Sequence, residues 1–339
     1  MKSLPLLVSL PTTVLALHLL ARELGWTEDQ REQARAFYQR GMPPLVDTHT
    51  LPFLFGVSPR LIADMRRNPR GYYRRFRIRK KAGGQRSILA PRRFIKVIQT
   101  WILRHVLEHA DIHECATGFR KDTNIFDNAA PHVGNSNLLV VDIKDFFGSV
   151  DQSSVSDSFR TLTNALDAPL TYPRDVAEQL ADLCTVDGSL PQGAPGSPVL
   201  ANISMRGADQ ELASLAESWG CGYTRYADDL AFSGPLTFSE EHVAGVVAIL
   251  ARHGFEQNSR KTRIIGMGGR QVIAGVVVNA VAQPPRWKRR RWRAMFHRAA
   301  TDPTRVVAKE AYLQGVASFV NQYSPSLATE YHSIVQGLQ

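Results

Sequence analysis

The feature that most constrains this chain is a pair of adjacent aspartates, Asp228 and Asp229, enclosed by apolar, strand-like sequence. Residues 222–234 read GYTRYADDLAFSG, so the acids fall where two short strands would turn. Neighbouring carboxylates repel each other, and a divalent cation is the natural compensation for such clustered charge. A solvated surface turn is the alternative for a bare acid pair, but the apolar flanks on both sides favour a hairpin packed in a core.

A third acid, Asp142, ends the short apolar run LLVVDI at residues 138–143, which predicts a buried strand. By itself it would be a helix-capping or strand-end residue. Together, the three carboxylates supply what a two-metal site needs to clamp the attacking and leaving oxygens of a phosphoryl displacement.

The charge distribution indicates a nucleic-acid partner. The 339 residues include 41 Lys and Arg against 31 Asp and Glu, a net charge of +10. Thirteen of the basic residues lie in 66–96 and seven in 286–298, and neither stretch contains an acid. One basic stretch is usually a solvated face, but two acid-free stretches with interleaved aromatic residues favour phosphate-backbone binding.

Other classes of protein fit the sequence less well. Three widely spaced cysteines without a CxxC pair argue against a zinc site or a disulfide framework. The first 21 residues loosely resemble a signal peptide, but Pro5 and Pro11 interrupt the apolar run. We expect a short packing helix there, no membrane span and a cytoplasmic location.

The order of the predicted elements favours an α+β fold. Helices are expected over 12–40 and 240–254 and from 286 onward, with a helix start at 27–30. Residues 74–91 predict two strands around a Gly-Gly turn, and 272–279 predict one further strand.

Five segments, in order, resemble the motifs of reverse transcriptases. RIRKKAGGQRSILAP is similar to their fingers hairpin, LLVVDIKDFF to the strand with their first aspartate, and LPQGAPGSPVLANI to their template-gripping loop. YADD resembles their catalytic hairpin, and QNSRKTRI resembles the segment that supplies their general-acid lysine. These matches span about residues 70–280.

Within this family the chain looks most like bacterial retron reverse transcriptases. Asn128-Ala129-Ala130-Pro131-His132 fits their NAxxH pattern just before the first catalytic strand. Ile273-Ala274-Gly275 occupies the place of their VTG triplet but keeps only the glycine, so the threonine hydroxyl is lost.

The resemblance implies a right-hand polymerase with fingers, a palm built on an antiparallel sheet with helices, and a helical thumb. Its expected parts are an N-terminal helical region at 1–60, fingers at 61–137, a palm at 138–280 with a helical insertion at 155–190, and a thumb at 281–339.

The resemblance also implies roles for individual residues. Asp142, Asp228 and Asp229 would be catalytic carboxylates that hold two Mg²⁺ ions, with the backbone carbonyl of Ile143 as a further ligand. Lys261 would donate a proton to the leaving pyrophosphate.

Nucleotide contacts are expected from Lys80 and Arg86 beside the incoming triphosphate, from Phe147 as a block against a 2′-hydroxyl, and from Gln192. RNA contacts are expected from Asn128 and His132, the latter having a structural role as its alternative. On the expected thumb helix, the spacing of four arginines favours one basic face laid along a duplex: Arg286, Arg289, Arg290 and Arg293.

The function so implied is copying of a structured non-coding RNA into DNA from dNTPs. A retron enzyme would make RNA-linked multicopy single-stranded DNA and act in anti-phage defence, with an effector protein as a possible partner. The alternatives are a group II intron-like, diversity-generating or abortive-infection reverse transcriptase, or a non-catalytic RNA-binding protein on the same scaffold. Only 54 residues follow position 285, which disfavours the intron type.

Overall fold

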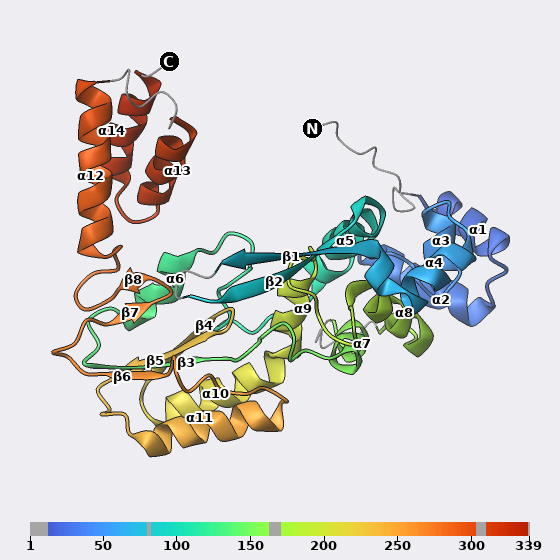
Figure 1. Cartoon of the computed structure of the whole chain (residues 1–339). Helices are drawn as coiled ribbons and strands as arrows, with labels where there is room; N and C mark the ends of the chain where they lie inside the picture. The colour runs from blue at the N-terminus through green and yellow to red at the C-terminus, as the bar shows by residue number, and fades with distance from the viewer. Residues whose placement is uncertain (1–12, 80–82, 163–170, 303–309, 338–339) are drawn as a thin grey trace. The chain divides into compact units, whose positions relative to one another are not determined.

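The chain forms two compact units in a computed structural model that describes residues 13–79, 83–162, 171–302 and 310–337. Unit 1 comprises residues 1–113, 145–208 and 253–255, and unit 2 comprises residues 114–144, 209–252 and 256–339. The chain therefore crosses between the units several times. Figure 1 shows the helices and strands of both units, coloured along the chain.

Unit 1 consists of helices and one β-hairpin. Its elements are α1 (Val14–Glu23), α2 (Glu28–Gln39), α3 (Thr50–Leu54), α4 (Pro59–Arg67), β1 (Tyr73–Arg79), β2 (Gln85–Pro91), α5 (Arg93–His105), α7 (Gln152–Arg160), α8 (Arg174–Cys184) and α9 (Ser197–Ser204), with short 3-10 turns at Pro69–Tyr72 and Leu107–His109. The predicted helix start at 27–30 is confirmed, because Thr27 and Gln30 form a reciprocal capping box.

The predicted hairpin in the first basic stretch is also confirmed. Strands β1 and β2 pair antiparallel from Tyr73 opposite Pro91 to Arg79 opposite Gln85. Gly83 and Gly84 both have positive φ, the conformation that glycine adopts most readily.

Unit 2 is built on a four-stranded antiparallel sheet in the order β4-β5-β3-β6. Its elements are α6 (Ile125–Ala129), a 3-10 turn (Ala130–His132), β3 (Asn137–Asp142), β4 (Gly222–Tyr226), β5 (Asp229–Gly234), α11 (Glu240–Arg252), β6 (Arg263–Ile265), β7 (Val272–Ile273), β8 (Val276–Val277), α12 (Arg286–Thr301), α13 (Glu310–Asn321) and α14 (Pro325–Gln336). Helix α10 (Arg206–Ser218) begins just before the unit boundary, and α10 and α11 cover one face of the sheet (Figure 1).

The sheet places its central strands in the core. Five of the six residues of β3 are buried, as the continuous apolar run predicts. Leu138, Val140 and Ala231 pack with Phe126 from α6 and with Ile273 from β7. This burial fixes the register of β3 against β5, and the register decides which residues meet at the strand ends.

The prediction of a single strand over 272–279 is wrong. The segment forms a two-residue hairpin in which Val272 pairs with Val277 and Ile273 with Val276. Ala274 and Gly275 have φ of 46° and 84°, so the chain reverses at these two residues. A pair of positive-φ residues matches the right-handed twist of the strands on either side, which is why it forms tight hairpin turns.

The three C-terminal helices share a small core of their own. Trp292 and Phe296 from α12 pack against buried residues of α13 and α14. The rings of Phe296 and Tyr331 stack with their centroids 3.6 Å apart. No helix in the described ranges has the length and apolar character needed to cross a bilayer.

Candidate active site

Two of the three predicted acids meet across the central strands of unit 2. Asp142 is the last residue of β3 and lies directly opposite Asp229, the first residue of β5. Asp228 directly precedes Asp229 in the turn between β4 and β5. The Asp228 carbonyl oxygen accepts a 2.8 Å hydrogen bond from the Ile143 amide. Asp142 is only 2% exposed, whereas Asp228 and Asp229 are half-buried. The sheet therefore brings the three acids to one end, as the sequence predicts.

The turn between β4 and β5 is tight and unusual. Ala227 has a φ of 58°, a left-handed conformation that residues with a Cβ rarely adopt. A Cβ added to Gly118 would lie 2.7 Å from the Ala227 backbone nitrogen. Glycine at 118 thus permits the close backbone approach that holds this turn in place.

Two residues of the segment before β6 bind Asp142. Lys261 Nζ donates a hydrogen bond of 2.6 Å to Oδ2, and Asn258 Nδ2 donates one of 2.9 Å to Oδ1. The Asn258 amide also donates to the Asp142 carbonyl oxygen at 2.8 Å. Both oxygens of the buried carboxylate are thereby paired, which offsets the cost of its burial.

The clustered charges shift the pKa values of the site. Burial, together with the charges of Asp228 and Asp142, raises the pKa of Asp229 to about 6, against the opposing effect of Lys261 and Arg263. Burial lowers the pKa of Lys261, but its hydrogen bond to Asp142 and the neighbouring acids raise it overall. Lys261 is therefore a protonated donor at neutral pH.

The donor chemistry of this site fits a hard divalent cation. Carboxylate oxygens and a backbone carbonyl are the ligands that Mg²⁺ prefers. Among the described residues, no three His, Cys, Asp or Glu side chains are grouped so as to hold an ion. In this structure Asp142 forms an ion pair with the Lys261 ammonium at 2.6 Å.

The expected nucleotide-binding residues belong to unit 1, whereas the three acids belong to unit 2. Arg86 is exposed on β2, and Lys80 lies outside the described residues. Phe147 is half-buried beside Phe146, with ring centroids 5.5 Å apart, whereas Phe146 is buried against Phe255. Phe147 is thus the more accessible of the two rings, and Phe146 belongs to the core.

Gln192 is tied to the β-hairpin of unit 1. Its carbonyl oxygen accepts a 3.0 Å hydrogen bond from the Leu89 amide. At Gly193 a Cβ would meet Ile88 Cγ2 at 2.9 Å and the Leu89 carbonyl oxygen at 3.0 Å. The Pro-Gln-Gly loop therefore depends on a glycine to pack against the hairpin.

Asn128 and His132 do not lie where an RNA contact requires them. Both side chains are completely buried. The His132 ring nitrogens bond Ser233 Oγ and Thr224 Oγ1, each at 2.7 Å, and burial lowers its pKa to about 4. A neutral ring between two strand hydroxyls supports β4 and β5, so the structural alternative accounts for His132.

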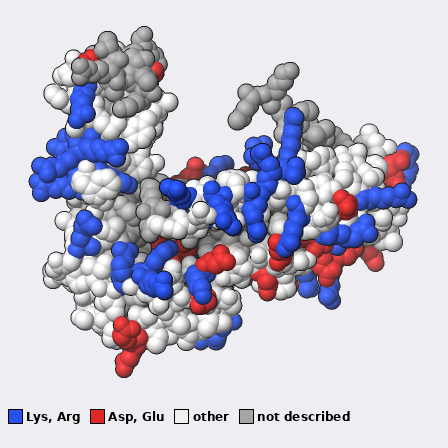
Figure 2. All heavy atoms as spheres, in the orientation of Figure 1, with Lys and Arg blue, Asp and Glu red and all other residues white. Residues whose placement is uncertain are grey.

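Three of the four predicted thumb arginines are exposed on α12. Arg286, Arg290 and Arg293 face solvent, while Arg289 is half-buried and its Nε donates to the Pro284 carbonyl oxygen at 3.1 Å. Figure 2 shows basic side chains gathered over this helix. The exposed basic face of α12 therefore contains three of the predicted arginines and not all four.

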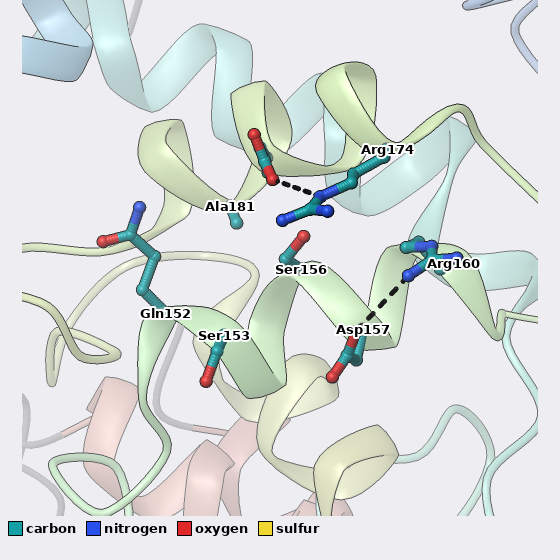
Figure 3. Close-up of a pocket in the computed structure, with 8 residues that line it drawn as sticks. Gln152, Ser153, Ser156, Asp157, Arg160, Arg174 and Ala181 are labelled. Atoms are coloured by element: carbon teal, nitrogen blue, oxygen red, sulfur yellow. Dashed lines mark hydrogen bonds and ion pairs between the residues drawn. The ribbon is translucent and has the colours of Figure 1, made fainter.

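A separate polar groove of about 620 Å³ lies between α7 and α8 (Figure 3). Its two arginines already have partners, because Arg174 pairs with Glu178 at 2.9 Å and Arg160 lies 4.0 Å from Asp157. None of the predicted site residues lines this groove.

Two residues that bond to the acids or to their turn, Asn258 and Arg225, were not predicted from the sequence. Asn258 lies in the quoted QNSRKTRI segment, and its contact with Asp142 spans 116 positions. Arg225, directly before Tyr226, is fully buried and paired with Asp209. A basic residue in a strand predicted to pack in a core was the available signal, since an unpaired buried charge is very costly.

The fold and the acid cluster together define the palm of a template-directed polymerase. The family model described as reverse transcriptase (RNA-dependent DNA polymerase) matches residues 78–288. The chain therefore belongs to the reverse transcriptase family, in its bacterial retron-type branch.

Two curated relatives illustrate the similarity. The retron Mx65 reverse transcriptase of Myxococcus xanthus is 36% identical over 276 residues, which cover 76% of this chain and 62% of the relative. The retron Ec86 reverse transcriptase of Escherichia coli is 31% identical over 248 residues, which cover 70% and 73% respectively. The chain thus spans 62% of the length of the Mx65 relative, and it spans 58% of the length of the retron Mx162 reverse transcriptase of Myxococcus xanthus.

Among solved structures, apo telomerase from Candida tropicalis aligns with 63% of this chain and 55% of its own, with a TM-score of 0.45 and 14% identity.

Proposed function

We propose that this chain copies RNA into DNA by nucleotidyl transfer at the acids of unit 2. The observation that carries the proposal is the register of β3 and β5, which sets Asp142 opposite Asp229 with Asp228 in the adjoining turn. Family membership supports the same reaction class. A merely RNA-binding scaffold would have no need for a buried carboxylate held by Lys261 and Asn258.

Asp142, Asp228 and Asp229 would hold two Mg²⁺ ions, with the Ile143 carbonyl as a further ligand. When bound, such ions stabilise the charge that develops on the attacking and leaving oxygens. The chain's own part is to fix the carboxylates. Asn258 orients Asp142, and the Ile143 amide fixes the carbonyl oxygen of Asp228.

Lys261 would act as the general acid. Its raised pKa keeps it protonated at neutral pH, so it can give a proton to the departing pyrophosphate. Arg86 and Lys80 would contact the triphosphate, Phe147 would exclude a 2′-hydroxyl, and Gln192 would contact the templating pair. The exposed arginines of α12 would bind duplex phosphates.

The retron-type relatives support a narrower proposal. The template would be a structured non-coding RNA, and the product a multicopy single-stranded DNA joined to it. The biological role would be anti-phage defence, in which an effector protein would be the partner.

Primer extension tests the reaction. Wild type and Asp229→Asn are compared on an RNA template with dNTPs and Mg²⁺. The variant keeps the shape of the side chain but loses its charge, so synthesis should fall by about 10²-fold or more, while template affinity stays within a factor of about two. Glu330→Gln, an exposed acid on α14, is the control. If Asp229→Asn made DNA as fast as the wild type, the proposed catalytic role of the acids would be wrong.

A further inference from the structure

A buried ion pair between Arg225 and Asp209 lies next to the turn that carries Asp228 and Asp229. Arg225 and Asp209 are both 0% exposed. Arg225 Nε donates to Asp209 Oδ1 at 2.8 Å, and Nη2 donates to Oδ2 at 2.6 Å, so the guanidinium binds the carboxylate with two parallel hydrogen bonds. Tyr223 Oη donates a further bond of 2.9 Å to Asp209 Oδ1. This geometry fixes the guanidinium in one orientation.

The third nitrogen of the same guanidinium reaches the turn. Arg225 Nη1 donates a hydrogen bond of 3.1 Å to the carbonyl oxygen of Ala227. Ala227 is the residue with a φ of 58°, and its carbonyl group belongs to the peptide that leads into Asp228. One planar side chain thus links the first turn of α10 to the peptide that sets the direction of the acid pair.

Holding β4 in place does not require this side chain. The backbone of Arg225 is already fixed on both sides, because its amide donates to the Cys115 carbonyl oxygen at 2.8 Å and its carbonyl accepts from the Thr117 amide at 2.9 Å. Apolar residues of similar size usually stabilise a core as well as a buried ion pair does. The hydrogen bond from Nη1 to the Ala227 carbonyl oxygen is what an apolar residue cannot supply.

We propose that Arg225, anchored by Asp209, is a positioning residue that holds the Ala227 peptide and thereby sets the placement of Asp228 and Asp229. The inference rests on the proposed function, and it adds a residue of β4 and one of α10 to the machinery of that site. Arg225 acts through the turn and does not itself touch the reacting groups.

Arg225→Lys tests this role, because lysine keeps the positive charge for Asp209 but carries its three donors on one nitrogen and lacks the planar fork whose separate nitrogens bind Asp209 and Ala227 together. Tyr223→Phe is the matched control, since it removes a bond to the same Asp209 without any bond to the turn. Glu211→Gln breaks the α10–α11 ion pair with Arg252, a second control on the same helix.

Three quantities are measured for each variant: kcat of primer extension per active molecule, the Mg²⁺ concentration at half-maximal rate, and hydrogen exchange of the Ile143 amide, which is bonded to Asp228. For Arg225→Lys we expect kcat to fall about 10- to 100-fold, half-saturating Mg²⁺ to rise and the Ile143 amide to exchange faster. Both controls should keep kcat within about twofold.

A purely structural ion pair gives a different result. Arg225→Lys would then lower the melting temperature while leaving kcat per active molecule, Mg²⁺ dependence and Ile143 exchange unchanged, and this would overturn the proposal. A fall in kcat for Tyr223→Phe as large as the fall for Arg225→Lys would overturn it as well. If Arg225→Lys does not fold, Tyr223→Phe decides alone, and a fall in its kcat of about tenfold or more would overturn the proposal. If the wild type makes no DNA, the proposed function is wrong. Exchange of the Ile143 amide in Arg225→Lys and in the controls then still tests whether Arg225 positions the turn.

Discussion

Asp229 bears an energetic cost that burial and its acidic neighbours impose. Its pKa is raised from 3.8 to about 6, so between these pH values the folded protein keeps a proton that the unfolded chain has lost. By linkage, stability contributed by this group falls as pH rises through that window. This loss of stability is expected for a site that buries several carboxylates close together before any cation is bound.

Asp229→Asn should relieve this cost. In EDTA at pH 7, we expect its free energy of unfolding to exceed that of the wild type by on the order of 1–3 kcal/mol, and the difference to vanish near pH 4. Urea unfolding across this pH range measures it, with Glu330→Gln as a neutral reference. A wild type that gains stability between pH 4 and 6 relative to the variant would contradict the assigned shift.

Phe147 offers a test of sugar selection at a single ring. The ring is half-buried beside Phe146, so truncation opens space without emptying the core. Phe147→Ala should raise ribonucleotide incorporation relative to deoxynucleotide incorporation about tenfold or more, a difference of about 1.4 kcal/mol in discrimination. Single-nucleotide extension with each class of substrate measures the ratio. Phe147→Tyr keeps the bulk and should retain the wild-type ratio, and an unmoved ratio in both variants would make Phe147 a packing residue.

At the scale of elements, the sequence predicts what is local. The capping pair Thr27 and Gln30, the Gly83-Gly84 turn and the apolar run of β3 each carry their signal within a few residues. The acid turn is predictable for the same reason, because apolar flanks on both sides of Asp228 and Asp229 define its strands.

Contacts that join distant segments were not predictable. Asp209 and Arg225 are 16 positions apart on a helix and a strand, and Asn258 reaches Asp142 over 116 positions. The error at 272–279 has a different origin, because an apolar run of eight residues does not reveal that Ala274 and Gly275 take positive φ. His132 was ambiguous between RNA and structure, and only burial distinguishes the two.

Helix α12 yields a prediction about phosphate contacts. Changing Arg286, Arg290 and Arg293 to Gln removes the exposed basic face. If each binds one phosphate, the slope of log K against log salt should flatten by about 2–3 units, at roughly 0.7–0.9 per contact. The loss should be similar for different RNA sequences, since phosphate contacts carry no sequence information.

The control for this helix removes equal charge from another face. Lys288, Arg291 and Arg298 lie away from the first set by helical spacing. Their change to Gln should leave the slope within about one unit. Titration of template–primer at several salt concentrations compares the two triple variants, and equal slopes would mean that α12 contributes only general positive charge.

At the scale of the whole molecule, the residues assigned to the proposed reaction come from both units of the chain. The acids and their supports belong to unit 2, whereas Phe147, Gln192 and Arg86 belong to unit 1. Asp142 and Phe147 are five residues apart in sequence, and the unit boundary falls between them at 144 and 145. Each unit also contains one of the two acid-free basic stretches.

The nature of the product tests the retron-type proposal for the molecule as a whole. The enzyme is expressed with its native flanking DNA, and the nucleic acid bound to it is purified and labelled at DNA 3′ ends. If synthesis starts on the template RNA itself, digestion with ribonuclease should shorten the labelled species without destroying it, because the DNA is joined to RNA. Asp228→Asn with Asp229→Asn should give no labelled product, since the carboxylates that would hold the cations are gone. Labelled DNA of unchanged length after ribonuclease treatment would show that the enzyme extends free primers, and would point to another class of reverse transcriptase.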